Sequence, residues 1–296
     1  MQMDSIQRFS IIKVTGHHAL PVTDELAVEE PLEIRVGYVV DQQLVMKNIS
    51  VTMRTPGHDA ELATGFLFTE GIIQSKDALA DVSHCFIACA ENKENVIQVN
   101  LKEGFTPILQ DTERNFYTTS SCGVCGKGSI AAIRTVSTFQ QSTEDNLFLS
   151  QEILNQLPIT LQKEQEVFAV TGGLHASALF TLSGDLLLLR EDVGRHNALD
   201  KLIGAAINKD WLPLTQTVLL LSGRVSFELV QKAAMAGIRI IAAVGAPSSL
   251  AIQLAEEFGI TLVGFLRNQR FNIYAGAHRI AIHTKETQTY SNEDKN

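Results

Sequence analysis

The chain contains no run of 18 or more apolar residues and no basic N-terminal stretch followed by an apolar one. A membrane-spanning helix needs about 20 consecutive apolar residues, so no membrane span is expected. A secretory signal would place an apolar segment behind a basic start, and residues 1–8 do not begin such a pattern. These absences together predict a cytoplasmic protein.

Positive charge is also scarce, because 24 Lys and Arg residues stand against 33 Asp and Glu residues, giving a formal net charge of −9. Proteins that hold nucleic acid usually carry a basic patch or stripe, so we expect no nucleic-acid partner. Hydrophobic residues make up 45% and charged residues 19% of the 296-residue chain, as in ordinary globular proteins. A local basic pocket for one anionic ligand is compatible with this balance.

Only four cysteines occur, and without an export signal we expect reduced thiols rather than disulfides. Cys122 and Cys125 form a Cys-x-x-Cys pair in a stretch of small and polar residues, about 110–129, which predicts a flexible loop. A mobile thiolate of this kind suits sulfur transfer. Two alternatives stay open: a zinc site completed by Cys85 and Cys89, and a redox-active pair, which usually lies at a strand-to-helix junction.

The first half of the chain carries strand patterns and one helix pattern. Residues 32–36 and 49–53 alternate apolar and polar side chains, as half-buried strands do. Asp59 is expected to cap the helix that follows. The two ends, residues 1–20 and 284–296, are weakly patterned and are expected to fray.

The run of polar residues at 140–146 predicts a linker. We therefore expect two domains. The N-terminal one, residues 1–145, is a smaller α+β domain that ends in the flexible Cys-x-x-Cys loop. The C-terminal one, residues 146–296, is an α/β domain that binds the ligand.

Short apolar strands alternate with helix patterns in the second half of the chain. Residues 218–221, 238–244 and 260–266 are the apolar runs, and glycines end the helical stretches between them. This alternation predicts a largely parallel sheet covered by helices. Upstream, residues 185–190 predict a buried strand and residues 195–207 a helix.

Three expected strand ends carry residues suited to an anion. In an open parallel sheet, ligands bind beyond the carboxyl ends of the strands. Backbone N–H groups at helix starts and arginine side chains both bind phosphate well, so we predict a phosphorylated or nucleotide ligand here. Each turn alone could equally be a simple helix cap. The three groups are Ser222, Gly223 and Arg224; residues 245–249; and Phe265, Leu266, Arg267, Asn268, Gln269 and Arg270.

Two more segments carry polar residues at expected helix starts. Residues 171–178, with His175, predict a glycine-rich helix start, and residues 191–197 open the next helix with His196 among them. A lone histidine is more often a satisfied structural residue than a catalyst, but the dense polar residues around His196 keep it as a candidate ligand-binding residue. Neither G-x-x-x-x-G-K-[ST] nor a complete G-x-G-x-x-G occurs, which argues against an ATPase or a dehydrogenase.

Together these segments resemble the FdhD family, the formate dehydrogenase accessory sulfurtransferases, over about residues 30–283. The motifs are specific in combination, and the cysteine pair shows no departure from the family pattern. The resemblance rests on Arg54–Asp59, the Cys122/Cys125 segment, Thr171–His175, Glu191–Lys201, Ser222–Arg224 and Gly264–Arg267.

The resemblance implies a sulfurtransferase that takes sulfur from a cysteine desulfurase. It passes the sulfur to the molybdenum (or tungsten) of the bis-molybdopterin guanine dinucleotide cofactor, which formate dehydrogenase needs. Cys122 matches the family's persulfide cysteine, Cys125 is the second catalytic thiol, and Phe265–Arg270 matches the cofactor-binding stretch. The resemblance also implies a homodimer and a cytidine-deaminase-like C-terminal domain.

Deamination itself is not expected, because zinc deaminases carry H-x-E and P-C-x-x-C motifs. Here His175 is followed by Ala176 and Ser177, and serines follow Pro247. We therefore expect no bound metal ion of the protein's own. The alternative function is that of a non-catalytic chaperone, which would only bind and deliver the molybdenum cofactor.

Overall fold

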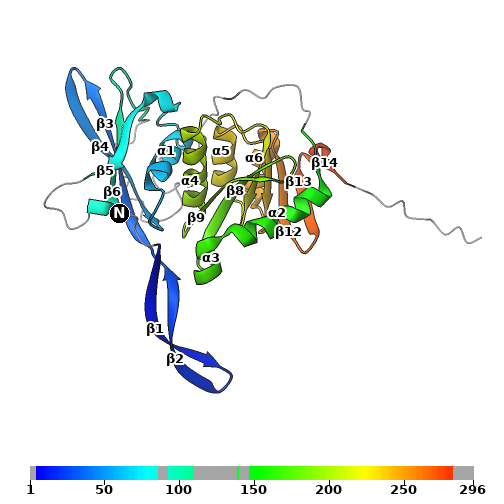
Figure 1. Ribbon diagram of the computed structural model, residues 1–296. Coiled ribbons are helices and arrows are strands. Elements are labelled where there is room, and N and C mark those ends of the chain that lie inside the picture. Colours follow the sequence, from blue (N-terminus) through cyan, green and yellow to red (C-terminus); the bar gives the residue numbers. More distant parts are fainter. Residues whose placement is uncertain (1–4, 86–92, 110–138, 140–146, 283–296) are drawn as a thin grey trace, which may run out of the picture.

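The structure is a computed structural model that describes residues 5–85, 93–109, 139 and 147–282, and Figure 1 shows their arrangement. In the first half the elements are β1 (Ile6–Thr15), β2 (His18–Ala27), β3 (Glu30–Val40), β4 (Gln43–Arg54), α1 (Asp59–Thr69), β5 (Leu79–His84) and β6 (Val96–Leu101). In the second half they are β7 (Leu149–Ser150), α2 (Gln151–Glu164), α3 (Glu166–Thr171), β8 (His175–Thr181), β9 (Leu186–Asp192), α4 (Arg195–Asn208), β10 (Thr217–Leu221), α5 (Phe227–Met235), β11 (Ile240–Ala243), α6 (Ser249–Glu257), β12 (Thr261–Arg267), β13 (Arg270–Ala275) and β14 (Ile280–Ala281). Short 3₁₀ turns lie at Lys76–Ala78, Lys93–Asn95 and Ala277–Arg279.

The larger sheet has six strands in the order β13-β12-β11-β10-β8-β9. The expected alternation of strands and helices is confirmed, and β10, β11 and β12 pair in parallel. The outer strands β8, β9 and β13 pair antiparallel, so the sheet is more mixed than the sequence predicted. The β8–β9 and β12–β13 pairs are antiparallel because short turns join their strands, and only an antiparallel pair can be joined by so few residues.

Helices cover both faces of this sheet, which is why its central strands are continuously apolar. Along β10, Leu219 and Leu221 belong to the buried cluster that includes α4, α5 and α6. The alternate residues Val218 and Leu220 pack in a second cluster with α2. Figure 1 shows α4, α5 and α6 side by side over the sheet, with α2 on the opposite side. The part of the chain that is described contains no helix that is both long and apolar enough to span a membrane.

The smaller sheet has four strands in the order β4-β3-β6-β5 and packs against α1. One continuous cluster of buried apolar residues joins the two halves of the molecule. It runs from Ile34 in β3, through Leu62 in α1 and Leu199 in α4, to Leu219 in β10. The expected linker at 140–146 and the Cys-x-x-Cys loop at about 110–129 lie outside the described residues, so the domain boundary near residue 145 stays a prediction.

The N-terminal segment is not frayed, as the sequence had suggested, but forms a long hairpin. Strands β1 and β2 pair in antiparallel register from Ile6 opposite Ala27 to Thr15 opposite His18. Figure 1 shows this hairpin projecting from the rest of the molecule, and β2 touches α3 near its base. Both faces of the hairpin are largely exposed, so its sequence has no buried stripe from which a strand could be recognised.

Two local predictions about helix starts were also wrong. Asp59 does not cap α1, because His58 takes the cap position in a left-handed conformation and Asp59 is the first helical residue. The Asp59 carboxylate instead binds the Arg54 guanidinium. Residues 171–178 do not begin a helix either. Gly172, at φ 65°, ends α3 and the chain continues directly into the buried strand β8, the usual role of a glycine just after a helix.

Two glycines set how closely α1 and α4 approach each other. A Cβ atom built on Gly65 would lie 1.9 Å from the backbone oxygen of Asp200, and one built on Gly204 would lie 1.9 Å from that of Glu61. Only residues without a Cβ can occupy these positions, because backbone cannot move aside as a flexible side chain can. This contact brings the N-terminal sheet, carried by α1, against the α/β half.

Replacing Gly204 by alanine is expected to lower the free energy of unfolding by about 2–3 kcal/mol, because α1 and α4 would have to separate. Urea unfolding followed by circular dichroism would measure the loss. Gly173→Ala is the matched control, since the nearest atom to a Cβ there, the Ala27 Cβ, lies at 3.8 Å, an ordinary van der Waals contact. A gain of about 0.5–1 kcal/mol for Gly204→Ala, the ordinary effect of replacing a helical glycine, would show that the helices do not pack this closely.

Candidate functional site at the strand edge

The ends of five strands lie along one edge of the six-stranded sheet. His175 at the start of β8 pairs with Asp192 at the end of β9. Leu221 at the end of β10 pairs with Ser177 of β8 and with Ala243 at the end of β11. The loops that follow β9, β10, β11 and β12 therefore open toward the same side. The three segments that the sequence marked for an anion are brought to this edge.

The loop after β10 is held tightly to its neighbours. Ser222 Oγ accepts a hydrogen bond from the Ala176 N–H at 2.8 Å. The Val225 N–H donates to the Ala246 oxygen at 3.0 Å, and the Gly245 N–H donates to the Gly223 oxygen at 3.1 Å. The Ser222 N–H and the Gly223 oxygen are thus already bonded within the protein, while the Arg224 side chain is exposed. The exposed guanidinium is the charged group that this loop offers to a ligand.

The turn between β12 and β13 presents two arginines to solvent. Arg267 and Arg270 are partners across this hairpin, and the two turn residues between them, Asn268 and Gln269, have positive φ. All four side chains are exposed, as an anion-binding site requires. Phe265, also at positive φ, donates its N–H to the Gly245 oxygen at 3.0 Å and so ties the segment to the loop after β11.

Leu266 differs from the rest of this segment, because its side chain is 1% exposed and packs in the core on the α2 side of the sheet. It would anchor the hairpin and not contact a ligand. The start of α6 is likewise already satisfied in part, since Ser248 Oγ accepts the Ala251 N–H at 3.2 Å. The arginines, more than the helix starts, make this edge suitable for phosphate.

His196 binds within the protein and is 6% exposed. Its Nε2 atom lies 3.1 Å from Ser226 Oγ and 3.1 Å from Glu228 Oε2. Burial would raise the pKa of Glu228, but the hydrogen bond and charge of His196 lower it overall. His196 therefore joins α4 to the start of α5, just beyond Arg224. Glu228, two residues after Ser226, was missed from the sequence, where an acidic first turn is merely a common helix feature.

His175 lies half-buried near the middle of the edge. Burial lowers its pKa, and the nearby positive charge of Arg195 lowers it further, so the imidazole is neutral at neutral pH. A Cβ atom on Gly223 would lie only 3.1 Å from His175 Nδ1, which places the ring directly against the loop after β10. The helix expected around His175 is absent. The His175 ring nevertheless lies beside the Ser222–Arg224 segment, which the sequence had marked for an anion.

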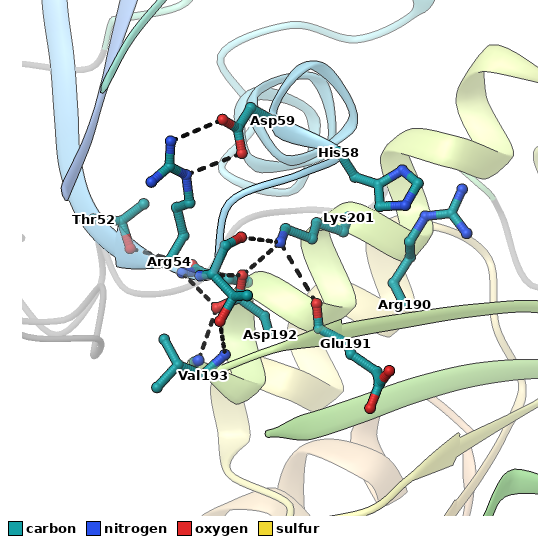
Figure 2. A network of polar contacts seen from close by, with 12 residues as sticks. Thr52, Arg54, His58, Asp59, Arg190, Glu191, Asp192, Val193 and Lys201 are labelled. Atoms are coloured by element: carbon teal, nitrogen blue, oxygen red, sulfur yellow. Dashed lines mark hydrogen bonds and ion pairs between the residues drawn. The ribbon is translucent and has the colours of Figure 1, made fainter. Parts of the chain in front are cut away.

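A buried polar network, drawn in Figure 2, joins two of the sequence segments that the family resemblance singled out. Lys201 Nζ lies 2.7 Å from Asp192 Oδ2 and donates to the Thr55 oxygen at 2.8 Å. Asp192 also accepts the N–H groups of Thr55 at 3.2 Å and of Gly194 at 2.8 Å. Burial raises the pKa of Asp192, and the Lys201 ammonium opposes that rise.

The same network continues to α1. Arg54 donates from Nε and Nη2 to the two oxygens of Asp59, at 3.0 and 2.9 Å, and both side chains are buried. Arg190 makes the equivalent two-pronged contact with Glu61, at 2.6 and 2.8 Å. Burial would raise the pKa of Glu61, but Arg190 and His58 lower it to about 2. These segments therefore fasten the N-terminal half to the strand edge, a structural role that sequence reasoning did not assign.

Cys122, Cys125 and Cys89 lie outside the described residues, so no geometry is stated for the Cys-x-x-Cys pair. Cys85 is half-buried as a free thiol, with its sulfur 3.6 Å from Gln98 Oε1. Within the described ranges no three His, Cys, Asp or Glu side chains gather as metal ligands. The zinc alternative stays untested, because it needs cysteines from the other segments.

The protein is thus an α/β protein that exposes arginine side chains along one edge of its six-stranded sheet. The model of the FdhD/NarQ family matches residues 27–281, and the chain belongs to that family. It is 51% identical over 283 residues to a protein of Mycolicibacterium paratuberculosis, covering 95% of this chain and 100% of the relative. A protein of Sulfolobus acidocaldarius is 43% identical over 275 residues, covering 93% and 98%. Both relatives are named sulfur carrier protein FdhD.

A solved structure has the same fold. It is described as a putative formate dehydrogenase accessory protein from Desulfotalea psychrophila, with a TM-score of 0.71 and 21% identity. The match covers 94% of this chain and 100% of the other. The α/β class expected from the sequence is thereby confirmed, and so is the family that the motifs resembled.

Proposed function

We propose that this protein is a sulfur carrier. In this proposal Cys122 accepts sulfane sulfur from a cysteine desulfurase as a persulfide and passes it to the bis-molybdopterin guanine dinucleotide cofactor used by formate dehydrogenase. The observation that carries the proposal is the 51% identity, across the full length of the relative, to a protein named as a sulfur carrier. The Cys-x-x-Cys pair supplies the thiol that such a role needs.

The loading step is a thiol exchange. The Cys122 thiolate attacks the terminal sulfur of the donor's persulfide, the donor's S–S bond breaks, and the donor cysteine leaves as a thiolate. A new S–S bond holds the sulfane sulfur on Cys122. No net oxidation occurs, because one persulfide replaces another.

The unloading step needs two electrons, since the sulfane sulfur must leave as hydrosulfide. Cys125 can supply them: its thiolate attacks the inner sulfur of the Cys122 persulfide, a Cys122–Cys125 disulfide forms, and hydrosulfide is released to the acceptor metal. A cellular dithiol reductant then restores both thiols. This assigns Cys125 as the residue that resolves the persulfide.

The acceptor would be held through its phosphates by Arg267 and Arg270, with Arg224 on the adjoining loop. The guanidinium group matches phosphate in shape and charge. The three side chains are exposed along one strand edge, in a chain whose net charge is otherwise −9. The positive charges that would bind an anionic ligand therefore lie along this strand edge.

The homodimer belongs to the proposal as well. The β1–β2 hairpin exposes Ile12 at 70%, Val14 at 66% and Leu20 at 63%, and a two-stranded hairpin alone is marginally stable in water. A second copy of the chain covering this hairpin in the cytoplasm would shield these residues. Analytical ultracentrifugation should show a dimer, and deletion of residues 6–27 should give a monomer.

The sulfur-carrier proposal is tested by measuring whether Cys122 becomes a persulfide. After incubation with a cysteine desulfurase and cysteine, peptide mass spectrometry should find one extra sulfur atom on the Cys122 peptide. The peptide with Cys85 serves as the internal control and should stay unmodified, because that thiol is half-buried in the structure. A protein that gains no sulfur on Cys122 or Cys125, yet still binds the cofactor, would be a chaperone and not a carrier.

A further inference from the structure

An aromatic and apolar patch lies on the surface at the end of α4 that is far from the strand edge. Trp211, the one tryptophan of the chain, is 38% exposed there. Ile108 and Phe105 are 44% and 41% exposed, and together with Trp211 they make up what we call the Trp211 patch. Single exposed apolar residues are common on protein surfaces, but tryptophan is enriched where protein partners bind.

The turn at residues 71–78, which follows α1, brings two of these residues together. The Ile108 N–H donates to the Ile72 oxygen at 2.9 Å. Lys76 in the same turn forms an ion pair with Asp210, the residue directly before Trp211. Ile108 and Trp211 therefore border the same turn, although they lie far apart in the sequence.

The third residue and a charged rim complete the patch. The Phe105 N–H donates to the Lys102 oxygen at 3.1 Å, and the Lys102 N–H donates to the Ala78 oxygen at 2.8 Å, at the end of the same turn. Lys209 Nζ lies 5.3 Å from the centre of the Trp211 ring. An apolar centre with a polar rim is the usual build of a protein interface. The exposed charged residues around the patch carry both signs: Asp77, Lys102, Glu103, Lys209 and Asp210.

The patch lies where the Cys-x-x-Cys segment leaves the described part of the chain. Leu109 is the last described residue before that segment, and it follows Ile108 directly. Cys122 comes 13 residues later, and 13 residues can span at most about 45 Å. A protein bound on the patch would therefore hold its own sulfur within reach of Cys122.

The strand edge stays free when the patch is occupied. Helix α4 begins at Arg195, just after β9 reaches the edge, and ends at Asn208, close to Trp211. A helix of 14 residues is about 21 Å long, so the patch and the edge lie roughly this far apart. This distance is shorter than the reach of Cys122. A donor on the patch and an acceptor at the edge therefore need not compete for one surface.

We propose that the Trp211 patch docks the protein that supplies sulfur to Cys122. The inference rests on the proposed function, since it assigns a surface to the sulfur donor of that function. The donor has to meet the thiol, and the patch adjoins the segment that carries the thiol. The client enzyme receives the cofactor, which the proposed function places at the strand edge, at the opposite end of α4.

The test combines two measurements on the full-length protein. Isothermal titration calorimetry with a cysteine desulfurase measures docking, and peptide mass spectrometry at low donor concentration measures how fast Cys122 gains sulfur. Trp211→Ala is expected to bind the desulfurase about 30-fold more weakly, the loss typical of a central aromatic anchor. Ile108→Asp places a charge in the same patch and should weaken binding at least as much. Ile159→Ala is the matched control, because that residue is 47% exposed on α2 and lies outside the patch.

Glutathione persulfide separates docking from the chemistry of the thiol. This small donor needs no docking surface, so it should load Cys122 of Trp211→Ala and Ile108→Asp at the rate of the unmodified protein. Slow loading from glutathione persulfide as well would mean that the patch acts on the Cys-x-x-Cys segment itself, which would overturn the inference. The changes are at exposed side chains, so the circular dichroism spectrum and the urea midpoint should stay unchanged.

Unchanged affinity of both patch variants for the desulfurase would also overturn the inference. In that case loss of the dimer in sedimentation would assign the patch to a second copy of the chain, and loss of client activation would assign it to the client. The carrier proposal would stand in these cases, provided that the unmodified protein gains sulfur on Cys122. If the unmodified protein gains none, the carrier proposal fails and the docking inference fails with it.

Discussion

Cys122→Ala is expected to abolish the activation of formate dehydrogenase while leaving the fold intact. Alanine has no thiol, so no persulfide can form and no sulfur can be passed on. The measurement is formate oxidation by the client enzyme in cells that contain only the variant protein. A loss of at least about 100-fold is expected, because in the proposed mechanism Cys122 is the thiol that carries the sulfur.

Two controls separate the chemistry from stability. Cys85→Ser should activate the client normally, since Cys85 lies directly after β5 and is not part of the Cys-x-x-Cys pair. The circular dichroism spectrum and urea midpoint of Cys122→Ala should match those of the unmodified protein. Full activation by the Cys122 variant would remove the persulfide from the proposal and favour the chaperone.

Asp192→Ala is expected to lower the free energy of unfolding by about 3–5 kcal/mol, because it leaves a buried ammonium without its counter-charge. Lys201 is 1% exposed and lies 2.7 Å from the Asp192 carboxylate. The N–H groups of Thr55 and Gly194 would lose their acceptor at the same time. Urea unfolding at pH 7 measures the change, and the protein should also lose client activation as α1 detaches from the strand edge.

Asp185→Ala is the matched control, since that carboxylate lies in the exposed turn before β9 and accepts hydrogen bonds from the nearby Thr181 and Ser183 hydroxyl groups. Its effect should stay within about 0.5 kcal/mol. Replacing both charged partners, as Asp192→Leu with Lys201→Met, should recover much of the lost stability, because no unpaired buried charge remains. A single variant as stable as the control would mean that the network in Figure 2 does not fasten the two halves together.

The strand–helix alternation of the second half could be predicted because each element carries its own pattern. The apolar runs that became β10, β11 and β12 are short, and glycines punctuate the helices between them. The position of α4 was predicted for the same reason. The β1–β2 hairpin could not be predicted, because neither of its faces packs in the core and its sequence shows no apolar stripe.

The residues of the candidate site could also be predicted from the sequence only in part. Arg267 and Arg270 could be predicted, since a basic turn directly after an apolar strand is visible in the sequence. His196 was singled out as a candidate ligand-binding residue, and nothing in the sequence indicated its contacts with Ser226 and Glu228 at the start of α5, some 30 residues further along.

By itself, the sequence determined the family, the α/β class and the chemistry available, because these depend on residue types and short-range spacing. The tertiary structure alone decided which distant groups meet: Arg54 and Asp59 beside Asp192 and Lys201, and Glu228 beside His196. Such meetings depend on how α1 and α4 pack at their two glycines and on the order of strands in the sheet. Contacts between residues more than a hundred positions apart leave no local pattern along the chain, since long-range packing and not local spacing creates them.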